Sequence, residues 1–297
     1  MQTRRELIVS GMGLAAMIAV GRTARAQDSL SRFNALMANL QADPGLAANA
    51  KEGADKPILT VAARRAGAKT KPSKLKISNR AAQLIVTAEV TSPKTYTKRY
   101  QGAIWPKGQS GVTVGVGYDI GHTIPEQFWS DWKPYLPHET LDRLMIGCEA
   151  TGDEAAFLLE ALKDIKIPWE IAHKQFVQRQ LPREIGLAER SLPNFAELPE
   201  DCRGAIVSLT YNRGTAGFQA APLDEPEGRR KEMKTVYDLM AARNFAAIPD
   251  EFLKMRRLWE DKPSMAGVVL RREAEAALFQ IGLDSQVDLN MQGIVIR

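Results

Sequence analysis

The residue best suited to chemistry is Glu89, a single acid at the end of an apolar helical run that begins near residue 79. Burial beside apolar side chains disfavours an ionised carboxylate, and the negative end of the helix dipole acts in the same direction. A carboxyl group in such a place can hold a proton near neutral pH and donate it to a leaving group. The alternative interpretation is a solvated glutamate at a helix end, with no catalytic role.

A Gly-rich segment with the alternation of a β-hairpin follows this helix. Residues 101–117 read as two short strands joined by a turn at residues 106–108. In the second strand, valine at every other position alternates with Thr113, Gly115 and Gly117, so that one face is apolar and the other nearly bare. Bare backbone lets a polymer lie close to the strand. Alternatively, the glycines only relieve crowding in a tight hairpin.

Rival chemistries have little support in the sequence. The spacing of the glycines up to Gly121 resembles a dinucleotide-binding fingerprint, but no β-α-β pattern surrounds it. The three histidines, His122, His138 and His173, lack the spacing of a helical metal site. We find no Ser-His-Asp set and no phosphate-binding loop, so we expect no metal and no cofactor.

Three blocks of the chain, in order, resemble one family. The helix ending in Glu89, the hairpin and the run SGVTVGVGYDIG at residues 110–121 resemble the catalytic opening of phage-type lysozymes (glycoside hydrolase family 24) and their pesticin-like bacterial relatives. Residues 202–214 resemble the central helix of that family, and residues 265–279 resemble its closing helix. The resemblance covers about residues 76–283.

The resemblance implies an α+β, lysozyme-like fold, with a small β-hairpin lobe packed beside a helical bundle. It also implies hydrolysis of the β-1,4 bond between N-acetylmuramic acid and N-acetylglucosamine in peptidoglycan. Glu89 falls at the position of the general acid, and Thr113 falls where the family keeps a threonine that helps to place the attacking water. Many members have an aspartate between these positions, but residues 90–112 contain no acid. Asp119 is the nearest candidate for a second carboxylate, and capping a turn is its alternative role.

Further site residues follow from the resemblance and from residue type. In the family an arginine of the closing helix lies close to the catalytic glutamate, which implies a supporting role for Arg271 and Arg272. A solvated face of ion pairs is the alternative for these two residues. The aromatic residues Trp105, Tyr118 and Trp129 are candidate platforms for stacking sugars, and core packing is their alternative role.

The missing aspartate keeps other functions open. A lytic transglycosylase needs only the glutamate, because a hydroxyl of the sugar itself attacks. A wall-binding module would keep the fold without activity. A secreted toxin against neighbouring bacteria would use the same chemistry on another target.

The N-terminus has the pattern of an export signal. Arg4 and Arg5 precede an apolar run, and residues 24–26 form a small-x-small cleavage site, which predicts a twin-arginine signal over residues 1–26. An ordinary secretory signal is the alternative. The apolar run is short and rich in Gly and Ala for a membrane span. We therefore expect a periplasmic or secreted bacterial protein with no stable membrane insertion after cleavage.

Positive charge gathers before and around the predicted catalytic helix. Residues 51–100 hold twelve Lys and Arg against three Asp and Glu, within a chain of formal net charge +5. Such a basic arm could hold the protein on an anionic polymer such as the cell wall, or it could be a solvated linker. Residues 51–80 contain no aromatic side chain, so nucleic acid is not an expected partner. We expect a monomer that binds peptidoglycan glycan strands.

The remaining patterns predict the organisation of the chain. Residues 27–75 read as a basic, largely flexible extension that contains one amphipathic helix, either docked or a spacer; residues 76–283 form the catalytic domain, and residues 284–297 a tail. Cys148 and Cys202 permit one disulfide. Periodicity and the Pro and Gly breaks predict helices at about residues 124–132, 138–148, 152–164, 169–190, 199–212, 229–243, 244–258 and 266–281.

Overall fold

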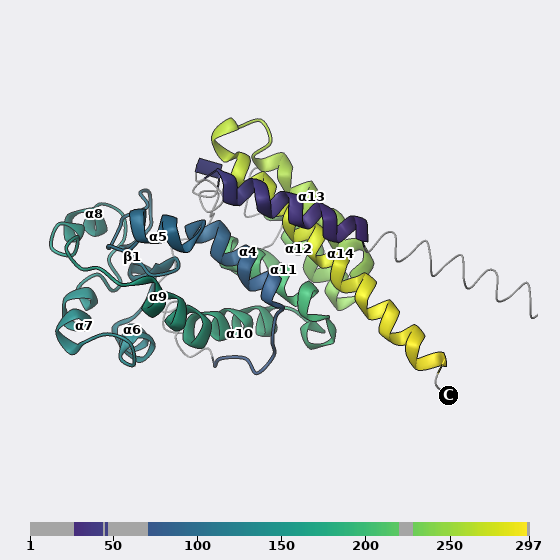
Figure 1. Ribbon diagram of the computed structural model, residues 1–297, viewed down its shortest axis with the longest axis horizontal. Helices are drawn as coiled ribbons and strands as arrows, with labels where there is room; N and C mark the ends of the chain where they lie inside the picture. The colour runs from purple at the N-terminus through teal and green to yellow at the C-terminus, as the bar shows by residue number, and fades with distance from the viewer. Residues whose placement is uncertain (1–26, 44, 47–70, 220–227, 296–297) are drawn as a thin grey trace, which may run out of the picture.

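The computed structural model describes residues 27–43, 45–46, 71–219 and 228–295. The predicted export signal and residues 47–70 of the extension lie outside the described residues. The described chain is mostly helical and contains one two-stranded antiparallel sheet, as an α+β class requires. In Figure 1 the sheet and helices α5 to α9 lie at one end, and α11 to α14 lie at the other.

The predicted helices occur in the predicted order, but α5 (Pro93–Arg99) was not predicted, and the helix expected at residues 152–164 ends at Leu159. The expected helix at residues 169–190 contains a π-helical segment, η2 (Phe176–Gln180), and the expected helix at residues 244–258 has 3₁₀ turns at both ends. The last helix continues past residue 283, where a tail was expected. The α-helices are α4 (Asn79–Val90), α5 (Pro93–Arg99), α6 (Pro125–Trp132), α7 (His138–Met145), α8 (Asp153–Leu159), α9 (Trp169–Gln175), α10 (Leu181–Ser191), α11 (Glu200–Arg213), α12 (Lys231–Ala241), α13 (Ile248–Lys254) and α14 (Ala266–Val295).

Local residues define both ends of α4. The hydroxyl of Ser78 accepts a hydrogen bond from the main-chain N–H of Ala81 at 3.2 Å, which caps the first turn. Thr91 then adopts a positive φ of 65°, which ends the helix. Ser92 caps the next helix, α5, whose first residue is Pro93. Glu89 is therefore held in the last turn of a helix with fixed ends.

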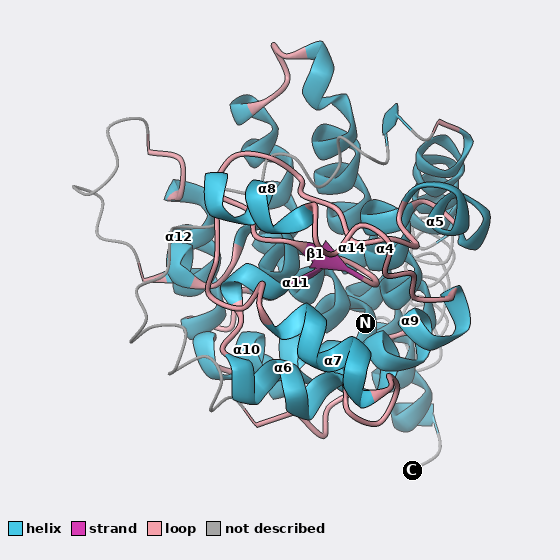
Figure 2. Ribbon diagram, turned by 90° about the vertical axis from the view of Figure 1, so that its left-hand side faces the viewer, coloured by secondary structure: helices cyan, strands magenta, loops and turns pink. Residues whose placement is uncertain are grey.

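The sheet is smaller than expected, and its two strands are joined by a turn at residues 115–117 instead of the predicted turn at residues 106–108. Strand β1 (Thr113–Val114) pairs with β2 (Tyr118–Asp119), and Ile104 makes one further antiparallel bridge to Thr113. Figure 2 shows this sheet among loops and short helices. The predicted pairing across residues 106–108 is thus reduced to a single bridge. The predicted second strand ends at Val114, because residues 115–117 form the β1–β2 turn.

Helix α11 is the centre of the helical part. It packs against α14 and α4, and twelve of its fourteen residues are buried. A Cβ atom at Gly204 would lie 2.1 Å from the Cβ atom of Ala81 in α4, so the two helices approach so closely that only glycine fits there. This packing fixes α4, and with it Glu89, against α11.

The amphipathic helix of the extension is docked rather than a spacer. Residues 27–42 are helical, and the side chains on one face belong to the same core cluster as the rest of the described chain. They are Phe33, Leu36, Met37 and Leu40. Among the described residues, we find no helix with the length and apolarity needed to cross a membrane.

The disulfide that the sequence permits is not formed. Cys148 and Cys202 are both free. The thiol of Cys202 donates a hydrogen bond to the main-chain carbonyl of Phe279 at 3.1 Å, which places it between α11 and α14. Burial raises the pKa of the Cys148 thiol to about 12.

Candidate active site

Glu89 lies inside the protein, where α4 meets the sheet. Only 7% of the residue is exposed. One carboxylate oxygen, Oε1, is 3.1 Å from Nη1 of Arg271 in α14. The other, Oε2, lies against Gly117, because a Cβ atom at Gly117 would be 2.8 Å away from it. The interpretation of Glu89 as a solvated helix end is therefore wrong.

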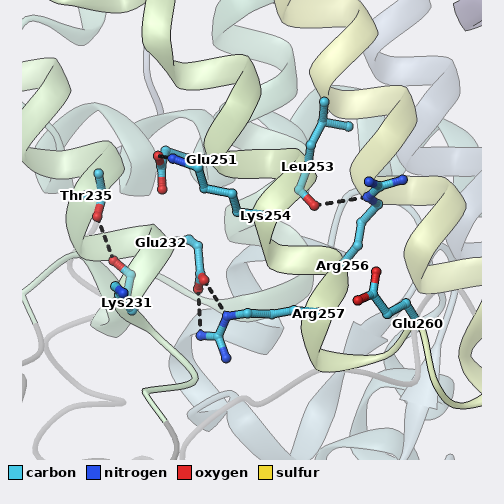
Figure 3. Close-up of a pocket in the computed structure, with 9 residues that line it drawn as sticks. All are labelled: Lys231, Glu232, Thr235, Glu251, Leu253, Lys254, Arg256, Arg257 and Glu260. Carbon is cyan, nitrogen blue, oxygen red and sulfur yellow. Dashed lines mark hydrogen bonds and ion pairs between the residues drawn. The ribbon is translucent and has the colours of Figure 1, made fainter.

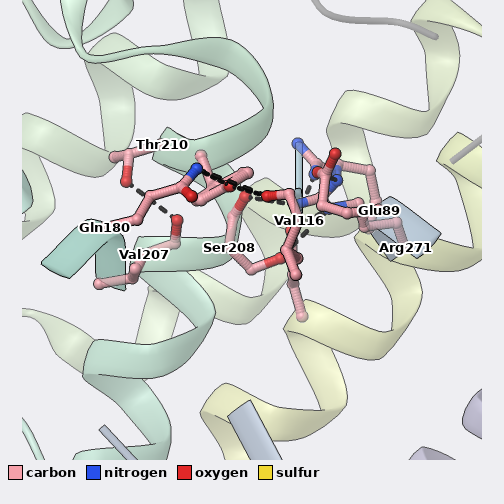
Figure 4. A network of polar contacts seen from close by, with 10 residues as sticks. Glu89, Val116, Gln180, Val207, Ser208, Thr210 and Arg271 are labelled. Atoms are coloured by element: carbon pink, nitrogen blue, oxygen red, sulfur yellow. Dashed lines mark hydrogen bonds and ion pairs between the residues drawn. The ribbon is translucent and has the colours of Figure 1, made fainter. Parts of the chain in front are cut away.

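Arg271 is held by α11 as well as by Glu89. Its Nη2 donates to the main-chain carbonyl of Ser208 at 2.9 Å, and its Nε donates to the Ser208 hydroxyl at 3.2 Å. Figure 4 shows these contacts together with Glu89. The guanidinium is fully buried. Arg271 thus brings a fixed positive charge from the last helix to the carboxylate that ends α4.

Arg272 and Glu275 extend this buried charge cluster. Nη2 of Arg272 is 2.8 Å from Oε1 of Glu275, and the same oxygen accepts a hydrogen bond from Ser208 at 2.6 Å. Burial lowers the pKa of Arg272 to about 9, and burial raises the pKa of Glu275 against the opposing effect of the two arginines. Both arginines are completely buried. The alternative of a solvated ion-pair face is therefore wrong for Arg271, Arg272 and Glu275, whose side chains are buried.

The two glycines of the predicted strand lie in the β1–β2 turn, with φ of 60° at Gly115 and 69° at Gly117. The space next to Gly115 is filled by Trp132, whose ring would be 2.8 Å from an added Cβ atom. The space next to Gly117 is filled by the carboxylate of Glu89. The prediction that both glycines leave a face bare for a polymer is therefore corrected. They make room for an indole and for the candidate acid.

Thr113 and Asp119 are cross-strand partners that both contact Gly111. The hydroxyl of Thr113 donates to the Gly111 carbonyl at 3.3 Å. Both carboxylate oxygens of Asp119 accept from the Gly111 N–H, at 3.1 and 3.3 Å, and Oδ2 is 3.8 Å from Nε2 of His122. Asp119 therefore has a structural role, although its carboxylate holds Gly111, which precedes strand β1, rather than capping the following turn.

The three aromatic candidates differ in their surroundings. Tyr118 is buried, and its hydroxyl donates to Asp131 at 2.7 Å while its ring packs edge to face on Trp132. Its assignment as a sugar platform is wrong, because the ring has no free face. Trp105 and Trp129 are half-buried, and the indole N–H of Trp105 donates to the Ser110 carbonyl at 3.0 Å. A stacking role for these two tryptophans stays a prediction.

Sequence reasoning missed Ser208 and Glu275. A serine amid the apolar residues of α11 gave no signal of its own. Glu275 follows Arg271 by four residues, a spacing that places both side chains on one face of a helix. In the sequence this spacing fits a solvated ion-pair face as well as a buried one, so it does not single out Glu275.

A separate surface cavity of about 590 Å³ lies between α12, α13 and the 3₁₀ segment Met255–Leu258. Figure 3 shows its lining of charged side chains. Glu232 pairs with Arg257 through both oxygens, at 2.6 and 3.1 Å, and Glu251 pairs with Lys254 at 2.6 Å. None of the predicted site residues lines this cavity. Its buried carboxylates are already neutralised by their neighbours.

Within the described ranges, no three His, Cys, Asp or Glu side chains come together as a metal site would need. The chain matched no model of a known protein family, and it matched no curated protein.

Proposed function

We propose that the protein is an exported peptidoglycan hydrolase of the lysozyme-like type, with Glu89 as its general acid. The observation that supports this is the placement of one carboxylate in a largely buried position between Gly117 and Arg271. Burying an ion pair costs desolvation free energy, and packed apolar side chains would often stabilise a core as well. A buried Glu–Arg pair at the junction of helix and sheet is therefore better explained by chemistry than by stability.

The proposed reaction cleaves the β-1,4 bond between N-acetylmuramic acid and N-acetylglucosamine. Glu89 donates its proton to the glycosidic oxygen as the bond to the anomeric carbon breaks, and the sugar gains oxocarbenium character. Arg271 stabilises the carboxylate that this transfer creates. A water molecule then adds to the anomeric carbon and releases its proton to the surrounding water, from which Glu89 regains a proton before the next cycle. Thr113 is the proposed positioning group for that water.

A lytic transglycosylase is the second candidate, and the contacts of Asp119 favour it. Both oxygens of this carboxylate are engaged by the N–H of Gly111. A single-carboxylate reaction needs no second acid, since a hydroxyl of the muramic acid attacks its own anomeric carbon and returns a proton to Glu89. The products carry 1,6-anhydro ends, whereas hydrolysis leaves reducing ends. Mass spectrometry of digested cell wall separates the two.

The proposed function also implies a cellular location and a binding partner. It places the protein in the periplasm or outside a bacterial cell, acting on glycan strands of its own wall or of a neighbour's. A wall-binding module without activity is the competing proposal. It predicts that changes at Glu89 leave a muropeptide-release assay unaffected.

The test is Glu89→Gln in a muropeptide-release assay. We expect activity to fall by about 100-fold or more, because the amide cannot donate the acid proton. Glu232→Gln is the matched control, since Glu232 is also buried and also pairs with an arginine. We expect this control to keep wild-type activity. Equal activity in Glu89→Gln and wild type would contradict the proposed role.

A further inference from the structure

The turn that touches Glu89 is held from its other side by two buried polar side chains. The main-chain carbonyl of Val116, the middle residue of the turn, accepts a hydrogen bond from the hydroxyl of Tyr211 at 2.6 Å. It also accepts from Nε2 of Gln180 at 3.4 Å. The Gln180 amide donates to the Tyr211 hydroxyl as well, so the three groups form one closed set of contacts. Figure 4 shows Gln180 and Val116 in this arrangement.

The two side chains come from different elements. Tyr211 belongs to α11, the helix that also carries Ser208, and Gln180 is the last residue of the π-helical segment η2. A π-helical turn holds one more residue than an α-helical turn, and it shifts the side chains that follow it around the axis. Both residues are almost completely buried. Burial, and next the charge of Glu89, raise the pKa of Tyr211, so its hydroxyl remains a hydrogen-bond donor.

We infer that Tyr211 and Gln180 are positioning residues for Glu89, which they influence through the turn of residues 115–117. The inference rests on the proposed function. Gly117 follows Val116, whose carbonyl accepts these hydrogen bonds, and it lies against Oε2 of Glu89. A turn with two glycines has few side-chain contacts of its own to hold its shape. The hydrogen bonds to the Val116 carbonyl therefore fix the position of the Gly117 backbone beside the Glu89 carboxylate.

The test compares two buried tyrosines that each donate to a main-chain carbonyl. Tyr211→Phe removes the hydrogen bond to Val116, and Tyr96→Phe removes an equivalent bond of 2.8 Å to Ile167, a residue outside the turn. On isolated glycan strands we expect Tyr211→Phe to lower kcat roughly 10- to 100-fold with little change in KM, because the acid is misplaced rather than the substrate released. We expect Tyr96→Phe to keep kcat. Tyr211→Phe loses two buried hydrogen bonds and Tyr96→Phe loses one, so both unfolding midpoints should fall, and that of Tyr211→Phe should fall further.

Gln180→Leu gives a second line of evidence. If both side chains act through the same carbonyl, the double variant should lose less kcat than the product of the two single losses. Amide hydrogen exchange at residues 115–117 should be faster in Tyr211→Phe than in Tyr96→Phe, and this measurement does not depend on activity.

The outcomes separate this inference from the proposed function. If the wild type is active and Tyr211→Phe has an unchanged kcat, Tyr211 is not a positioning residue for Glu89, but the proposed function is unaffected. A wild type that releases no product would overturn the proposed function. In that case, unchanged amide hydrogen exchange at residues 115–117 in Tyr211→Phe would show that Tyr211 does not hold the turn either. Faster exchange would show that it holds the turn.

Discussion

Glu89 is constrained by two neighbours that act in different ways. Arg271 attracts one of its oxygens by charge, at 3.1 Å. Gly117 admits the other oxygen only because it has no side chain. A carboxylate held on both sides has little freedom to rotate, which is the arrangement that proton transfer to a fixed oxygen requires. The site therefore depends on a missing side chain as much as on the charged ones.

At the residue scale, we predict that Gly117→Ala lowers activity much more than it lowers stability. The new Cβ atom would lie 2.8 Å from Oε2 of Glu89, at a residue with φ of 69°. We expect a loss of roughly 100-fold in muropeptide release from the displaced acid. Gly108→Ala is the control, because Gly108 has a similar φ of 60° and nothing within 4 Å of the added atom. It should show the backbone cost alone, about 1–2 kcal/mol, with activity retained. Similar activities for the two variants would refute the prediction.

At the scale of elements, α11 and α14 share a buried charge cluster, made of Ser208, Arg271, Arg272 and Glu275. Glu275 contacts both arginines through one oxygen, which also accepts from Ser208. A cluster of this kind is more sensitive to the loss of one member than to replacement of all of them, since one removal leaves a buried charge unpaired. Its position next to Glu89 links the packing of the two helices to the site.

We predict that Glu275→Gln lowers the free energy of unfolding by about 3–5 kcal/mol, because two buried arginines lose their common counter-charge. Denaturant unfolding measures the change. The neighbouring Glu273→Gln is the control. Its partner Arg256 is partly exposed, so that variant should cost no more than about 1 kcal/mol. Equal losses in the two variants would show that Glu275 is not a counter-charge of this kind.

At the scale of the whole molecule, the core contains three buried tyrosines. Tyr96, Tyr118 and Tyr211 come from α5, β2 and α11, and each donates its hydroxyl to a partner inside the protein. Burial raises the pKa of all three above the ordinary value of 10.0. The phenols are thus spread over both ends of the molecule and report on its folding as a unit.

This pattern predicts how stability depends on alkaline pH. The folded protein keeps three phenolic protons that the unfolded chain releases above a pH of about 10, so the unfolded state is favoured as the pH rises past that value. Stability should be constant with respect to these groups below it. Denaturant unfolding between neutral and alkaline pH measures the effect, with phenolate absorbance as the second signal. Early ionisation of all six tyrosines in the folded protein would contradict the prediction.

The sequence alone determined most helices and the place of Glu89 in the last turn of one of them. These features depend on neighbours within a few residues: the apolar period of residues 79–90 and the Pro and Gly residues that separate later helices. It also indicated Arg271 and Arg272 as supporting residues, through resemblance. The short range of these signals explains why the helical boundaries were recovered more fully than the sheet.

Only the tertiary structure decided which side chains meet. Arg271 could be a surface residue until its contacts with Ser208 and Glu89, 63 and 182 positions away in the chain, are known. Periodicity likewise could not show that Trp132 and Glu89 occupy the space beside Gly115 and Gly117, or that Tyr118 lacks a free face. The physical reason is that burial of a polar or bare residue is set by the partner packed against it, and that partner lies on another element.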